Sequence, residues 1–229
     1  MTPNNRLALL AFTVALAAPA AQASLATAAP FEEKVDNASS IILGRCLKNE
    51  SRWDPSGRWI LTYSTFKVLN TFKGGSAQEV TLVVPGGSVG GVHQSSVGLP
   101  AFNEGSENVL FIRNGKAGPT VLYFDQGAYD VVTNERGEKM VAPVASDVVH
   151  IDAQRGVAVP AEAPRSLNEF KSAVDRAVRS ADERRQKADM IRAKQQKGPS
   201  IGAMIIGNRL VLAALAIGLL LAAWQLFRR

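Results

Sequence analysis

Residues 85–91 read PGGSVGG, and residues 86–90 form a G-x-S-x-G pattern around Ser88. Such a pattern can place a serine nucleophile on a sharp turn between a strand and a helix, with His93 nearby as a base. That geometry needs a helix directly after the glycines. Residues 91–100 instead read GVHQSSVGLP, which is typical of a loop. A serine hydrolase using Ser88 therefore remains the weakest of three alternatives.

The same residues suit a binding loop better. Glycine adopts positive φ without strain, and long loops on a rigid scaffold often carry binding sites. We expect residues 85–100 to bind a protein partner without catalysis. The candidate contact residues are Gly86, Gly87, Ser88, Gly90, Gly91 and His93.

Few other residues could do chemistry. Cys46 is the single cysteine, so disulfides within the chain are excluded, and only two histidines are present. We expect no metal site and no cofactor. Cys46 lies in the apolar run IILGRCL, which favours a buried, unreactive thiol, with a catalytic or intermolecular cysteine as the alternative.

The middle of the chain predicts a mainly β domain over residues 35–160. Short β-rich runs alternate with turn residues, and no strand alternates with a long helix before residue 165. The segment WDPSGRW at 53–59 and the segment NERGE at 134–138 are typical of turns. The predicted strands cover 40–47, 59–69, 79–84, 108–113, 121–124, 129–133 and 139–141.

Several of these segments resemble a known family. The runs SIILGR at 40–45, YSTFKV at 63–68, FKG at 72–74 and VLFI at 109–112 are similar to the netrin/TIMP (tissue inhibitor of metalloproteinases) type of OB-like barrel. The pattern TY…KG…PGG…G looks like that of uncharacterised exported bacterial proteins with such a domain. The resemblance implies a small closed barrel and, as an alternative function, inhibition or regulation of an exported protease. The family's inhibitory N-terminal cysteine is absent, so no functional residue carries over.

Both ends of the chain suggest export. Residues 1–23 have the parts of a signal peptide with an A-x-A site before Ser24, although an uncleaved anchor is possible. Residues 24–34 are expected to be a flexible tail. Residues 201–227 predict a transmembrane helix, with 228–229 as a cytoplasmic end. A buried soluble helix and a cleaved sorting signal are the alternatives.

The net charge differs between the body of the chain and the segment that follows it. Residues 24–165 carry 13 Lys and Arg against 15 Asp and Glu, whereas residues 166–199 carry 9 against 5. The body therefore has no basic groove for nucleic acid. Residues 166–198 predict a helical stalk that begins with a Ser166–Glu169 capping box and an apolar stripe. Its C-terminal half is either a solvated stalk or a membrane-surface contact through Arg184, Arg185, Lys187, Arg192, Lys194 and Lys197.

Together these features predict a non-catalytic interaction module. It would be anchored in the cell inner membrane by a single span, with its folded domain in the periplasm or outside the cell.

Overall fold

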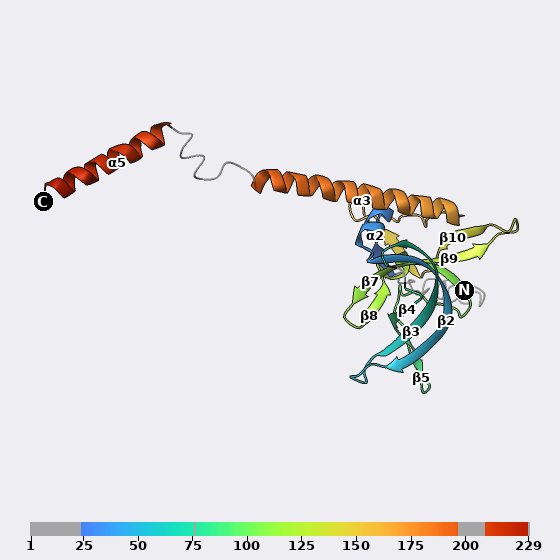
Figure 1. The fold of residues 1–229 in the computed structure, drawn as a ribbon. Coiled ribbons are helices and arrows are strands. Elements are labelled where there is room, and N and C mark those ends of the chain that lie inside the picture. The colour runs from blue at the N-terminus through green and yellow to red at the C-terminus, as the bar shows by residue number, and fades with distance from the viewer. Residues whose placement is uncertain (1–23, 76, 197–208, 229) are drawn as a thin grey trace, which may run out of the picture. The chain divides into compact units, whose positions relative to one another are not determined.

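The computed structural model describes residues 24–75, 77–196 and 209–228. The chain divides into two compact units after Val178. The first unit is built on one antiparallel sheet in the order β12-β10-β9-β7-β2-β3-β4, with β8 paired to β7 (Figure 1). Its strands are β2 (Ser40–Trp53), β3 (Ile60–Lys73), β4 (Glu79–Pro85), β7 (Glu107–Gly115), β8 (Gly118–Val121), β9 (Ala128–Thr133), β10 (Lys139–Pro143) and β12 (Arg165–Ser166).

The other regular elements of the described residues are two small sheets and four helical elements. The strand β1 (Ser24–Thr27) runs parallel to β11 (Val148–Ile151), and β5 (Gly87–Val89) forms a hairpin with β6 (Val92–Gln94). Residues 24–34, expected to be a tail, thus contain β1 and the start of a helix. The helical elements are α2 (Phe31–Asn37), the 3-10 helix η1 (Phe124–Gly127), α3 (Leu167–Gln196) and α5 (Arg209–Phe227).

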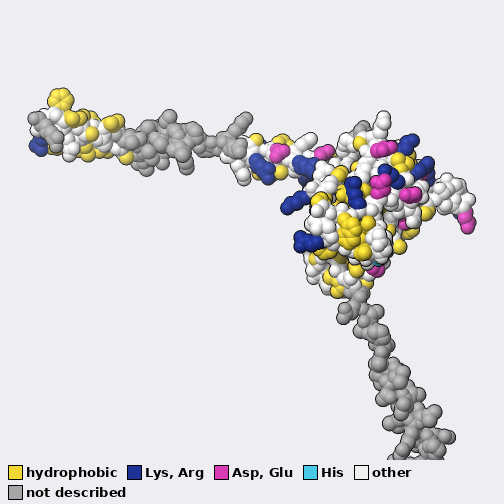
Figure 2. Space-filling view, turned by 90° about the horizontal axis from the view of Figure 1, so that it is seen from below, with side chains coloured by type: hydrophobic (Ala, Val, Ile, Leu, Met, Phe, Trp, Pro, Cys, Tyr) yellow, Lys and Arg dark blue, Asp and Glu magenta, His cyan; other side chains and the backbone are white. Residues whose placement is uncertain are grey.

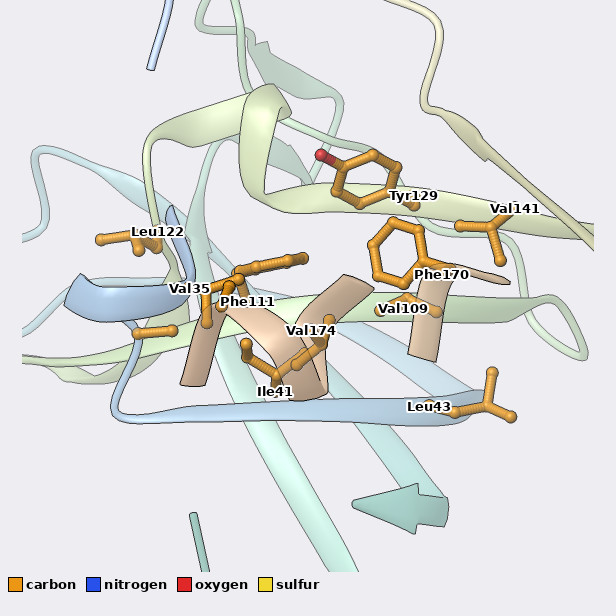
Figure 3. Packing of buried hydrophobic residues seen from close by; sticks show 12 residues of the cluster. Val35, Ile41, Leu43, Val109, Phe111, Leu122, Tyr129, Val141, Phe170 and Val174 are labelled. Carbon is orange, nitrogen blue, oxygen red and sulfur yellow. The ribbon is translucent and has the colours of Figure 1, made fainter. Parts of the chain in front are cut away.

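The sheet is buried on both faces. Along β7, Val109 and Phe111 join one apolar cluster, while Leu110 and Ile112 join another, as the alternation of side chains along a strand requires. In the first cluster, which we call the helical cluster, α2 and α3 cover the sheet (Figure 3). Its buried members include Val35, Ile41, Leu43, Val109, Phe111, Leu122, Tyr129, Val141, Phe170 and Val174.

The start of α3 belongs to this core. The Ser166 hydroxyl accepts a hydrogen bond from the Glu169 amide at 3.2 Å, and Glu169 Oε2 accepts one from the Ser166 amide at 3.0 Å, so the expected capping box is present. Phe170 and Val174 then lie fully buried, one helical turn apart. The first turns of the helix therefore serve as a wall of the domain.

The prediction of a closed OB-like barrel is wrong. The hydrogen-bonded order starts at β12 and ends at β4, and no ladder among the described strands joins these edges. The β2–β3 pair has several shifts of register, a feature of β-bulges, which bend strands. A side-chain carbon at Gly118 would lie 3.2 Å from Val83 Cγ2. The strands approach there through side chains, without backbone pairing.

The membrane predictions are also wrong. Where we expected a span over 201–227, the structure describes the helix α5 over Arg209–Phe227. Within the described ranges, no helix is both long and apolar enough to cross a membrane. The transmembrane helix, the membrane partner and the single-pass inner-membrane location are therefore not supported. The signal-peptide prediction and residues 201–208 and 229 lie outside the described residues.

The contact of the six basic residues with a membrane surface stays a prediction, because no observation on the described residues tests it. Five of the six lie exposed on the second half of α3, while Lys197 lies outside the described residues. Arg185 and Arg192 lie 3.7 Å and 3.8 Å from Asp182 and Asp189, each three residues earlier. Such exposed pairs contribute little to stability and are typical of a solvated helix.

Candidate functional site

The site begins with the turn that joins β2 to β3. Asp54 holds this turn, because its carboxylate accepts hydrogen bonds from the Ser56 hydroxyl at 2.7 Å, the Trp59 amide at 2.9 Å and the Arg58 amide at 3.0 Å. These bonds, the one from Ser56 foremost, lower the pKa of Asp54 to about 2. The carboxylate therefore stays ionised at every physiological pH and keeps the turn closed.

The turn carries two exposed tryptophans. Trp59 is 64% exposed and Trp53 is 38% exposed. Beside them, the guanidinium of Arg52 stacks 3.7 Å from the ring centre of Tyr63, so side chains also order the strand ends next to the turn. The sequence identified this segment only as a turn. The two tryptophans that bracket it were the available signal for a binding surface.

The predicted loop 85–100 lies against this hairpin. The Gln94 side chain joins the two, because its Oε1 accepts a hydrogen bond from the Ile60 amide at 2.7 Å and its Nε2 donates to the Arg58 carbonyl at 3.1 Å. The Gly86 amide donates to the Ile60 carbonyl at 2.8 Å. The loop is thus fixed to the β2–β3 turn at both of its strands.

The glycines of the loop have distinct roles. Gly87 has φ of 129°, and a side-chain carbon there would collide with the Ser51 and Thr62 hydroxyls and lie 2.9 Å from Ser51 Cβ. Gly90, with φ of 58°, lies in the β5–β6 turn with open space around it. Close packing therefore requires glycine at Gly87, whereas only backbone conformation favours it at Gly90.

Ser88 and His93 face each other across the β5–β6 hairpin. The Ser88 Oγ lies 2.9 Å from His93 Nδ1 in a solvent-exposed pair. Within the described residues, no carboxylate hydrogen-bonds the other ring nitrogen of His93. Ser88 lies inside the three-residue strand β5 and not on a strand-to-helix turn. It therefore lacks the geometry that the nucleophile of a G-x-S-x-G pattern needs.

We call the exposed face formed by the β2–β3 turn and the β5–β6 hairpin the tip surface. Its exposed apolar side chains are Trp53, Trp59 and Val92. Figure 2 views the domain from the end where the β2–β3 turn and β5 lie in Figure 1, and it shows hydrophobic side chains gathered there with Lys and Arg beside them. A hollow of about 600 Å³ separates Trp59 from residues 93–96 of the loop. The predicted site residues and the tryptophans thus form one surface.

The single cysteine is buried in the core. Cys46 is 1% exposed, packs with Phe66 and Leu82, and its thiol lies 3.7 Å from Asn49 Oδ1. Burial raises the pKa of the thiol, which keeps it in the protonated, unreactive form.

Comparison of the chain with protein-family models, with curated proteins and with solved structures found no match of any kind.

Proposed function

We propose that this chain is a non-catalytic interaction module that binds a protein partner through the tip surface. The observation that carries the proposal is Trp59, a large aromatic side chain held 64% exposed on a turn that Asp54 and Gln94 fix in place. Tryptophan is among the residues that contribute most to the binding energy of protein interfaces, and a turn that is already ordered loses little conformational entropy on binding.

The loop 85–100 supplies the second half of the surface. The hollow beside Trp59 is lined by both the β2–β3 turn and the loop, so an apolar side chain of a partner could enter between them. The Ser88–His93 pair then acts as a polar edge that donates or accepts hydrogen bonds. Apolar centres with polar edges are typical of protein interfaces.

Site-specific photocrosslinking in cells tests the proposal. A photoreactive phenylalanine analogue replaces Trp59, and a matched control places it at Val132, which is 54% exposed on β9. We expect a discrete crosslinked protein from position 59 only, and its loss when Gly87→Ala distorts the adjoining loop. Equal products from both positions would contradict the proposal.

The hydrolase alternative is tested separately. A fluorophosphonate probe should leave Ser88 unlabelled, because its hydroxyl has no fixed catalytic surroundings. Labelling of the wild-type chain that disappears in Ser88→Ala would show an active site.

A further inference from the structure

A hollow lies where the sheet stays open between β4 and β8. One edge of β8 pairs with β7, and no backbone ladder among the described strands joins β8 to β4. The hollow has a volume of about 320 Å³, at the lower end of the range for small-molecule sites. Its lining includes Val83 and Val84 of β4 and Gly118 and Thr120 of β8. The open seam of the sheet therefore borders a space large enough for a small ligand.

The lining of this hollow is mostly apolar. It includes the aliphatic residues Leu61, Leu99, Pro100 and Val121 and the aromatic residue Phe124. A ligand gains binding free energy by removing such surface from water, in proportion to the apolar area that it covers. The wall therefore suits a hydrocarbon chain.

The charged residues of the lining are both positive. Arg113 lies near the end of β7 and Lys116 in the β7–β8 turn, and both residues are exposed, so a ligand can reach them. The lining contains no Asp or Glu, and neither cation forms an ion pair within the part of the chain that the structure describes. Glu33 accepts a hydrogen bond from the Tyr123 hydroxyl at 2.7 Å but lies outside the lining. Two cations beside an apolar wall favour a ligand with a negative charge.

The backbone at Phe124 is an independent observation. Among the non-glycine residues that the structure describes, Tyr123 and Phe124 alone have positive φ, at 54° and 59°. Bulky residues rarely adopt this conformation, and strained residues cluster at binding sites. Phe124 is 59% exposed, so burial of its ring offsets little of the strain. Its place in the lining makes the ring available to a ligand.

We propose that this hollow binds an aliphatic carboxylate. The hydrocarbon chain lies against the apolar wall between β4 and β8, and the carboxylate pairs with Arg113 and Lys116. An arginine fork can bind both oxygens of a carboxylate at once. The inference does not depend on the proposed protein interface, because neither cation nor Phe124 lines the hollow beside Trp59.

Two probes of equal chain length and opposite charge test the proposal on the full chain. Octanoate should bind saturably and shift the NMR amide resonances of Gly118 and Thr120, whereas octylammonium should not. These two resonances restrict the measurement to the hollow. In the double variant Arg113→Gln/Lys116→Gln, the dissociation constant for octanoate should rise about fivefold or more. Arg136→Gln, which neutralises an exposed cation on the β9–β10 turn, should leave it unchanged.

Two further measurements test the apolar wall. Hexanoate should bind about tenfold more weakly than octanoate, because two fewer methylene groups are buried. Phe124→Asn should weaken octanoate binding without lowering the melting temperature, because asparagine tolerates the left-handed conformation. The proposal is overturned if octanoate and octylammonium act alike, or if hexanoate binds as tightly as octanoate. It is also overturned if either variant of the lining binds octanoate as tightly as the wild type does.

Discussion

Replacing Phe170 by alanine tests whether α3 is part of the domain core. Phe170 is fully buried, and its ring centre lies 5.0 Å from that of Tyr129, 5.5 Å from that of Phe31 and 6.2 Å from that of Phe111 (Figure 3). Its partners come from the sheet and from α2, so the cavity left by alanine cannot be refilled by one neighbour. We therefore expect Phe170→Ala to cost about 3–5 kcal/mol of unfolding free energy.

That loss corresponds to a clear thermal shift. For a domain of about 150–250 residues, each kcal/mol lowers the melting temperature by about 2–4 °C, so Phe170→Ala should melt about 6–20 °C below the wild type. Near-ultraviolet circular dichroism of the full chain measures the transition through the aromatic cluster itself. Phe170→Leu, which keeps more of the volume, should lose less.

The matched control lies further along the same helix. Met190 is 59% exposed on α3, and Met190→Ala should change the unfolding free energy by less than about 0.5 kcal/mol. If Phe170→Ala lowers the melting temperature no more than Met190→Ala does, the helix is not packed on the sheet and the reasoning fails.

Three further predictions concern single residues. Gly87→Ala should lower the melting temperature and reduce crosslinking at the tip surface, while Gly90→Asn should do neither, because only the first meets the Ser51 and Thr62 side chains and asparagine tolerates the left-handed conformation. Burial raises the pKa of Glu162, but Lys34, Tyr129 and Arg165 together outweigh it and lower that pKa. The stability from Glu162 is therefore present above its unfolded pKa of about 4.3 and lost as pH falls through the lower folded value, so Glu162→Gln should flatten acid unfolding curves there. Cys46 should resist a thiol reagent in the native chain and react fully in denaturant, whereas reaction at equal rates would contradict its burial.

Local patterns in the sequence predicted many of the strands and turns. The apolar run at 108–113 falls within β7, and the turn at 134–138 is closed by a hydrogen bond from the Asn134 amide to the Glu138 carbonyl at 2.9 Å. These features depend on neighbours in the sequence, so periodicity and turn residues reveal them. The β5–β6 hairpin was missed, because two three-residue strands among glycines leave no alternating pattern to recognise.

Closure of the sheet depends on distant residues and was not predictable in the same way. The β2–β3 pair contains register shifts, and Gly118 lies close to Val83, and no local sequence pattern specifies either feature. Likewise β1 pairs with β11, more than a hundred residues away, although nothing in its sequence specifies that partner. A family resemblance based on short strand motifs therefore could not decide between an open and a closed sheet.

Two aspartates show why some side-chain roles could be predicted from the sequence and others could not. Asp54 lies among Pro, Ser and Gly, and all its bonds reach residues within five positions, so its structural role can be read locally. Asp125 lies in a similarly short polar segment, but its surroundings come from His150 and from chain segments before and after it. The hydrogen bonds of the Asp54 carboxylate to its own turn account for this residue by its role in folding. Asp125 instead faces His150, whose Nε2 lies 3.3 Å from both of its carboxylate oxygens, and its backbone amide donates to the Gly98 carbonyl at 2.9 Å. Because both partners are far away in the sequence, no pattern around residue 125 could have revealed the role of this aspartate.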